Sequence, residues 1–155
     1  MKIFILRHGK AEPAMAGEAD SVRNLSDKGI LQVRKIASWM EMHQYIPQLI
    51  LSSPYNRALQ SAEIIKQALT ISAPIQLENA LIYGENPMKM YDIINSLDID
   101  SVLLSSHMPL VAELTHLFAP AAMNEGFHTA EIIKISFDKK NQHGIVTANI
   151  TPKEI

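Results

Sequence analysis

The stretch Lys2-Ile3-Phe4-Ile5-Leu6-Arg7-His8-Gly9 decides the fold. Its residues 3–6 form an unbroken apolar run, which is typical of a strand buried on both faces inside a parallel sheet. Arg7 and His8 follow at the carboxyl end of this strand, where open α/β folds bind their ligands. Gly9 lets the backbone turn sharply and come close to a bound group. The stretch therefore predicts an α/β protein with a cation and an imidazole at the mouth of its site.

The same order of apolar strand, polar turn and helix recurs along the chain. A second strand at Gln48–Ser52 is followed by a turn with Arg57, and a later strand at Ser101–Ser105 is followed by His107. Right-handed crossovers would place these strands in one parallel sheet, with their carboxyl ends at the same edge. Four side chains are therefore expected to converge at that edge: Arg7, His8, Arg57 and His107.

Capping residues mark where the other helices begin. Ser26 is a good N-cap for a helix that runs to about Met42. Asn86 followed by proline predicts a second helix start, and this helix is expected to run through the apolar residues Met88, Tyr91, Ile94 and Leu97. Pro109 is expected at the first position of the last helix.

The remaining segments complete the predicted architecture. Pro74–Leu77 is a short strand and Pro13–Asp20 is a small, irregular loop. Glu131–Phe137 and Gly144–Ile150 alternate in character and predict a hairpin at one edge of the sheet. We expect a three-layer α/β sandwich with a mostly parallel central sheet, helices on both faces and this antiparallel hairpin at the C-terminus.

Composition narrows the class of protein. The chain has 155 residues, which suits one domain over 1–155, and it is 47% hydrophobic and 19% charged. A net charge of −2 gives no broad basic surface for binding nucleic acid or a membrane. Any site for an anion therefore has to be formed by a few positioned cations. Without cysteine there is no disulfide framework and no thiolate zinc site. The opening apolar run is too short for a signal peptide or a membrane span, so a cytoplasmic location is expected.

The expected cluster of guanidinium and imidazole groups has the chemistry of an oxyanion pocket. Arginine side chains match phosphate oxygens two at a time and stay charged at any working pH. Arg23, just before a predicted helix start, is a candidate for a third arginine in the pocket. Because the arginines supply the positive charge, neither a metal nor another cofactor is required.

His8 adds a nucleophile to this pocket. A neutral imidazole can attack phosphorus through one nitrogen if the other is held as a donor, for which a backbone carbonyl is the expected partner. Nearby cations resist protonation of the ring and stabilise charge on the phosphoryl oxygens. Two other classes of protein stay open on these residues: a phosphate-binding module without catalysis, and a zinc hydrolase using His8 and His107. The chain has no His-Glu-x-x-His pattern, and flanking arginines would repel a cation.

Three motifs in order resemble the histidine phosphatase superfamily, the phosphoglycerate mutase-like proteins. They are Arg7-His8-Gly9, Ser52-Ser53-Pro54 followed by Arg57, and Ser105-Ser106-His107. The short chain and the stretch 21–26 (Ser-Val-Arg-Asn-Leu-Ser) are similar to the small bacterial SixA branch, the phosphohistidine phosphatases. The resemblance implies that His8 is the phosphorylated nucleophile. It also implies a phosphate pocket formed by Arg7, Gly9, Arg23, Arg57 and His107.

The sequence departs from the mutase-like pattern at the general acid. Those relatives carry a glutamate a few residues before a Tyr-Gly pair, which is Tyr83-Gly84 here, and the place of the acid falls on Ala80. Glu78 and Glu85 are near in sequence, but the sequence does not show where they point. An alkoxide leaving group needs a proton, whereas an imidazole leaving a phosphoramidate needs less help. A missing acid therefore favours a phosphohistidine substrate.

The chain also lacks room for the long insertion that covers the site in larger relatives. An open cleft can admit a side chain presented by another protein, so the expected partner is a histidine-phosphotransfer domain or a phosphocarrier protein bearing phosphohistidine. A small-molecule phosphomonoesterase of the same fold is the alternative.

Overall fold

A computed structural model describes residues 1–122 and 126–155 of the chain. A six-stranded sheet has the order β3-β2-β4-β1-β5-β6. The strands are β1 (Lys2–Arg7), β2 (Leu49–Ser52), β3 (Ile75–Leu77), β4 (Ser101–Ser106), β5 (Ile132–Asp138) and β6 (His143–Ile150). The helices are α1 (Asp27–Met42), α2 (Asn56–Ala68), α3 (Pro87–Ser96) and α4 (Leu110–Phe118), with 3-10 turns η1 (Asp20–Val22), η2 (Asn79–Leu81) and η3 (Pro152–Glu154).

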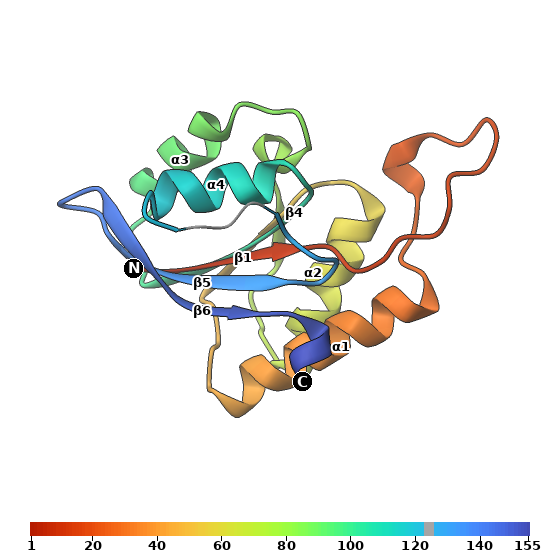
Figure 1. Ribbon diagram of the computed structural model, residues 1–155, viewed down its shortest axis with the longest axis horizontal. Helices are drawn as coiled ribbons and strands as arrows, with labels where there is room; N and C mark the ends of the chain where they lie inside the picture. The colour runs from red at the N-terminus through yellow and green to blue at the C-terminus, as the bar shows by residue number, and fades with distance from the viewer. Residues whose placement is uncertain (123–125) are drawn as a thin grey trace.

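The pairing of the strands confirms the predicted mixed sheet. Strand β4 pairs in parallel with β1 and β2, and β2 pairs in parallel with β3. Strand β5 pairs antiparallel with both β1 and β6, so the C-terminal hairpin forms one edge. Helices α3 and α4 cover one face of the sheet, and α1 and α2 cover the other (Figure 1). The carboxyl ends of β1, β2 and β4 therefore meet at one edge.

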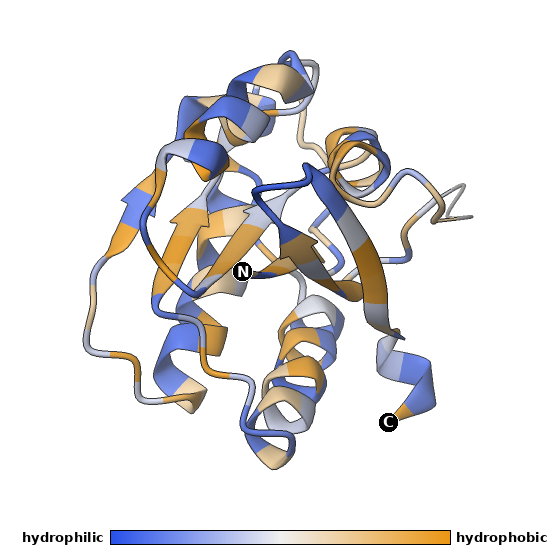
Figure 2. Ribbon diagram, turned by 90° about the vertical axis from the view of Figure 1, so that its left-hand side faces the viewer, coloured by the Kyte–Doolittle hydropathy of each residue, from blue (hydrophilic) through white to orange (hydrophobic). Residues whose placement is uncertain are grey.

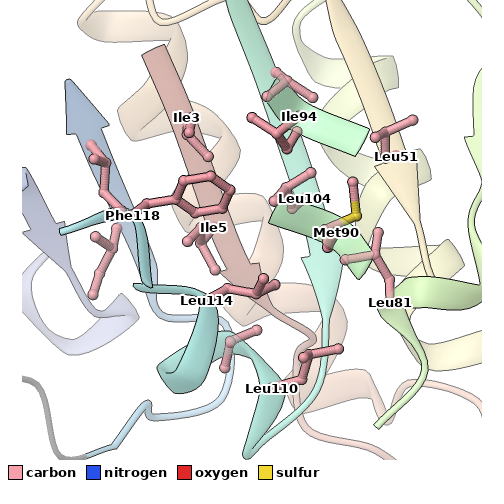
Figure 3. Packing of buried hydrophobic residues seen from close by; sticks show 14 of the residues in the cluster. Ile3, Ile5, Leu51, Leu81, Met90, Ile94, Leu104, Leu110, Leu114 and Phe118 are labelled. Carbon is pink, nitrogen blue, oxygen red and sulfur yellow. The ribbon is translucent and has the colours of Figure 1, made fainter. Parts of the chain in front are cut away.

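Strand β1 is the centre of both halves of the core. Ile3 and Ile5 point into the cluster under α3 and α4, whereas Phe4 and Leu6 point into the cluster under α1 and α2. All four side chains are buried because successive strand residues alternate between the two faces. Figure 2 shows the apolar strands enclosed between the helices, and Figure 3 shows Ile3 and Ile5 packed beside Phe118 and Leu114.

The predicted caps begin α1 and α3. The Ser26 Oγ accepts a hydrogen bond from the Gly29 N–H at 3.1 Å, and the Asn86 Oδ1 accepts one from the Met88 N–H at 3.0 Å. Helix α4 begins at Leu110, one residue later than predicted. Pro109 is its N-cap, because it precedes the first residue of the helix and its carbonyl accepts the first helical hydrogen bonds.

The apolar residues predicted along α3 are not all buried. Met88 is 42% exposed, whereas Met90 and Ile94 are fully buried. Residues four apart lie on the same face of a helix, so Met90 and Ile94 form the buried face. Met88, two residues before Met90, lies on a different side of α3.

Two glycines let the chain after His8 pass directly against the first turn of α1. A Cβ atom on Gly29 would lie 2.0 Å from the Lys10 carbonyl oxygen, and one on Gly9 would lie 2.6 Å from the Gly29 oxygen. The Ser26 N–H donates to the Lys10 carbonyl at 2.9 Å. This contact fixes the backbone that carries His8.

Across residues 1–122 and 126–155, no helix has the length and apolar character needed to span a bilayer.

Candidate active site

The four turn residues predicted to converge line a single cleft at the carboxyl edge of the sheet. The cleft has a volume of about 490 Å³. It is lined by Arg7, His8, Lys10, Ala11, Asp20, Arg23, Arg57, Tyr83, His107, Met108 and Thr129. A larger hollow of about 690 Å³ lies at the opposite edge, near Met1 and Asp100, and contains none of these groups.

The hydrogen bonds of His8 define its tautomer. Its Nδ1 lies 2.7 Å from the Gly9 carbonyl oxygen, and a carbonyl only accepts, so Nδ1 carries the proton. Its Nε2 accepts a hydrogen bond from the Arg57 Nε–H at 3.2 Å. The ring is therefore a neutral imidazole whose Nε2 lone pair faces the cations of the cleft. This is the arrangement that the sequence predicted for a nucleophile.

Burial and charge both keep His8 neutral. Its side chain is buried, and burial is the main cause that lowers its pKa to about 4. The hydrogen bond to Gly9 opposes this shift, while Arg57, Arg7 and Arg23 add to it. With a pKa of about 4, His8 is deprotonated at neutral pH.

His107 lies beside His8, with the two ring centroids 5.1 Å apart. Its Nε2 is 2.8 Å from the buried Ser53 hydroxyl, whereas its Nδ1 is buried without a hydrogen-bond partner. The pKa of His107 is lowered to about 3, mainly by burial, and the neighbouring His8 and Arg57 contribute to the same shift because they disfavour a second positive charge in the cleft. A buried imidazole nitrogen without a partner is suited to a group that enters the cleft.

Arg57 and Arg7 approach the cleft from α2 and β1. Arg57 is buried and uses all three nitrogens: Nε donates to His8, Nη1 donates to the Asp20 carbonyl at 2.8 Å, and Nη2 donates to the Asp20 carboxylate at 2.9 Å. Arg7 donates through Nη1 to the Phe127 carbonyl, and its buried Nε has no partner. Burial lowers the pKa of Arg7 and the charge of Glu131 raises it, with burial the larger effect.

Arg23 also lines the cleft, as the sequence predicted, but most of its donors are already used. Its Nη1 pairs with the Asp20 carboxylate at 2.9 Å. Its Nε and Nη2 donate to the Glu12 carbonyl at 3.0 and 2.9 Å. These contacts tie the segment before α1 to the cleft.

Gly9 has a different place from the one predicted, since it does not line the cleft. Its N–H donates to the Ser61 hydroxyl at 3.1 Å, and its carbonyl accepts from His8. The predicted contact with phosphate therefore has no free donor at Gly9. The residue orients His8 instead, and it needs to be glycine because it packs against Gly29.

Asp20 is one of several cleft residues that were not predicted from the sequence, among which are also Lys10 and Thr129. It ends the irregular loop 13–20 and begins η1, and its carboxylate bridges Arg57 and Arg23 at 2.9 Å each. Partial burial raises its pKa, but the hydrogen bonds from Arg23 and Arg57 outweigh this effect, so the pKa is lowered. The useful signal in the sequence was an acid three residues before Arg23 at a helix start.

Neither glutamate near the Tyr-Gly pair reaches the cleft. The Glu78 Oε1 accepts from the Ala80 N–H at 3.1 Å, and Glu85 pairs with Lys89 at 2.6 Å. Ala80 itself is buried in η2. Among the residues that the structure describes, Asp20 is the one carboxylate that lines the cleft.

The described part of the chain holds no group of three or more His, Cys, Asp or Glu side chains placed to bind a metal ion.

The fold and the site together define a class of phosphoryl-transfer protein, in which a neutral imidazole at the end of a parallel strand faces fixed arginines. The chain belongs to the histidine phosphatase superfamily (branch 1), and the sequence model of that family matches residues 3–82. The match covers two of the three motifs and Arg23.

Individual relatives extend this likeness over nearly the whole chain. Phosphohistidine phosphatase SixA of Escherichia coli is 30% identical over 142 residues, which are 90% of this chain and 87% of the relative. A SixA homologue of Haemophilus influenzae is 29% identical over 89% of each chain. A solved structure of the protein histidine phosphatase SixA with tungstate superposes with a TM-score of 0.92 at 27% identity, covering 99% of each chain.

The fold alone is shared more widely. A phosphoserine phosphatase of Entamoeba histolytica has the same fold, with a TM-score of 0.73 at 14% identity over 99% of this chain. The architecture alone therefore does not determine the substrate, which depends on the residues of the site.

Proposed function

We propose that the chain is a metal-independent phosphohistidine phosphatase that carries the phosphoryl group on His8. The observation that carries this proposal is the fixed tautomer of His8. Its Nδ1–H donates to the Gly9 carbonyl, so the Nε2 lone pair faces Arg57 inside the cleft. A histidine that only bound phosphate would do so as a donor, whereas this one presents a lone pair.

In the first step, the His8 Nε2 lone pair attacks phosphorus and the P–N bond of the substrate breaks. The electron pair of that bond goes to the leaving nitrogen, and the ring leaves as neutral imidazole when its other nitrogen carries a proton. Arg57 Nε–H passes from His8 to a phosphoryl oxygen, and Arg7 Nε and His107 Nδ1, both buried without partners, take further oxygens. Fixed donors of this kind stabilise the charge that develops on those oxygens.

In the second step, water attacks the phosphorus of phospho-His8. The N–P bond breaks, its electron pair returns to Nε2, and the proton of the water leaves with the phosphate product. His8 is thereby restored as the neutral tautomer. The low pKa of His8, about 4, keeps the ring ready for the next substrate at neutral pH.

The charges around the cleft favour a phosphohistidine substrate over a phosphate ester. Asp20, the one carboxylate of the described cleft, pairs with two arginines and has a lowered pKa, so it is ionised and has no proton to give. An alkoxide leaving group requires such a proton, whereas an imidazole does not. The names of the Escherichia coli and Haemophilus influenzae relatives support the same substrate class.

We infer that the phosphohistidine belongs to a protein. The nucleophile lies at the sheet edge in a cleft whose wall includes the 45% exposed Tyr83, and a side chain on a partner surface can enter there. A histidine-phosphotransfer domain or a phosphocarrier protein offers such a side chain. A small-molecule phosphomonoesterase remains the competing function, and it predicts turnover of sugar phosphates or nucleotides at comparable rates.

Incubation with ³²P-phosphohistidine proteins and phosphorylated metabolites tests the proposal. We expect release of phosphate from the proteins, undiminished by a strong chelator, and an acid-labile, base-stable label on His8. His8→Asn should abolish both the label and the release. Faster turnover of metabolites would favour the phosphomonoesterase, and saturable binding without release would favour a phosphate-binding module.

A further inference from the structure

We propose that Asp20 is a positioning residue that turns the reacting side of Arg57 towards His8. The inference rests on the proposed function, because it concerns Arg57, the hydrogen-bond donor that binds a phosphoryl oxygen during transfer to His8. Asp20 lies 37 residues before Arg57 in the sequence, and the two form an ion pair at 2.9 Å.

A guanidinium group has two sides that donate hydrogen bonds. Its terminal side carries Nη1 and Nη2, and its lateral side carries Nε and Nη2. Asp20 occupies the terminal side of Arg57 through both its carbonyl, at 2.8 Å, and its carboxylate, at 2.9 Å. The lateral side is thereby directed to His8 Nε2, at 3.2 Å. Asp20 and a phosphoryl group therefore use different sides of the same cation.

The position of Asp20 is itself fixed by Arg23. The second carboxylate oxygen of Asp20 pairs with Arg23 Nη1 at 2.9 Å, and the Asp20 carbonyl accepts from the Arg23 N–H at 3.3 Å. Arg23 is held in turn by the Glu12 carbonyl through Nε and Nη2. Asp20 thus connects a fixed arginine on one side to the phosphate-binding arginine on the other.

Burial explains why Arg57 needs such a partner. The Arg57 side chain is 6% exposed, and a buried cation without a counter-ion is costly and free to choose other contacts. The Asp20 side chain is 38% exposed, so it can neutralise the cation from the rim without entering the phosphate site. Removal of the carboxylate leaves the charge of Arg57 in place but releases its orientation.

The test compares single-turnover phosphorylation of His8 from a ³²P-phosphohistidine protein in matched variants. We expect Asp20→Ala to slow this step by about tenfold or more. Asp20→Asn, which keeps the shape and one acceptor, should lose less. Glu18→Gln is the control, because Glu18 belongs to the same loop and its carboxylate accepts a hydrogen bond from the Met15 N–H, away from the cleft-lining residues; its rate should equal that of wild type.

Two readouts separate positioning from a general loss of structure. Added formate should restore part of the Asp20→Ala rate, since it can replace the missing carboxylate at this exposed position. In an Arg57→Ala background, Asp20→Ala should cause little further loss, because both changes remove the same effect. An equal loss in both backgrounds, or a wild-type rate in Asp20→Ala, would overturn the inference. Absence of label on wild-type His8 would instead overturn the proposed function.

Discussion

The Nε–H of Arg57 lies 3.2 Å from the Nε2 of His8, so the lone pair of the proposed nucleophile faces a guanidinium group directly. This contact joins the residue that follows β1 to the first turn of α2, across 49 residues of sequence. It makes Arg57 a cation that hydrogen-bonds the reacting atom directly, and it explains part of the low pKa of His8. The contact also shows which arginine should matter most for transfer.

Replacement of Arg57 by lysine should impair phosphoryl transfer although the charge is kept. Lysine is a single point charge and cannot hold Asp20 on one side and a phosphoryl oxygen on the other. We expect the rate of His8 phosphorylation to fall by about 100-fold, the usual loss for one donor to a developing oxyanion. Rapid-quench labelling measures this rate. Arg34→Lys, on the exposed side of α1, is the matched control, and an equal loss in both variants would contradict the prediction.

Acid should destabilise the protein through His8. Its pKa is about 4 in the folded protein and 6.5 in the unfolded chain, so between these values the unfolded chain binds a proton that the folded protein does not. The free energy of unfolding therefore falls as the pH is lowered from 6.5 to 4. In the His8→Gln variant, the free energy of unfolding should decrease over this pH range by on the order of 3 kcal/mol less than in the wild-type protein.

Urea unfolding at pH 7 and at pH 4 measures the effect in both proteins. The variant should show the smaller decrease, with the contribution of His107 common to both. Equal decreases in the two proteins would show that His8 titrates alike in the folded and unfolded chains.

Binding of an oxyanion should protonate His107. Burial lowers its pKa to about 3, but a dianion in the cleft favours the charged ring and offers a partner to the unpaired Nδ1. We expect saturating tungstate at pH 6 to convert His107 to imidazolium, seen in its ring ¹⁵N and ¹H shifts. The exposed His43 is the internal reference and should not respond. Unchanged His107 shifts at saturation would exclude it from the anion site.

A methyl group at Gly29 should destabilise the fold and disturb the site. The added Cβ would lie 2.0 Å from the Lys10 carbonyl oxygen, so the chain beyond His8 has to move. We expect Gly29→Ala to lower the free energy of unfolding by about 2 kcal/mol, despite the better helix propensity of alanine. Gly126→Ala is the control, because among the residues that the structure describes the nearest atom to its Cβ would be the Met108 Cε at 4.0 Å. Equal stability of the two variants would show that the contact can relax.

The sequence was sufficient to predict the sheet and the meeting of the four turn residues. Each signal was local: an apolar run, a polar turn and a capped helix, with handedness placing the carboxyl ends together. This rule alone predicts that His8, Arg57 and His107 lie close together. It does not predict their hydrogen bonds, because the partners of Arg57 and His107 depend on loop conformations that the hydrophobic pattern of the sequence does not determine.

Asp20 is the clearest example of a site residue that could not be predicted from the sequence. It lies in an irregular loop, and an acid is not expected in a pocket for anions until its pairing with Arg23 and Arg57 is seen. The directions of Glu78 and Glu85 were likewise undetermined, because each is set by a contact with its own turn or helix. Helix α3 has apolar residues on more than one side, and tertiary packing buries the side with Met90 and leaves Met88 exposed.

Strand β1 has a hydrogen-bonded neighbour on each side, β4 and β5, and His8 is the first residue after it. The backbone that carries the reacting ring therefore cannot shift unless the middle of the sheet separates, which demands nearly as much free energy as denaturing the whole chain. The surrounding rim, by contrast, is built from surface turns that can be exchanged at little cost. Substitutions in the rim can therefore change which partner surface the cleft accepts, while the position of His8 and its chemistry are kept.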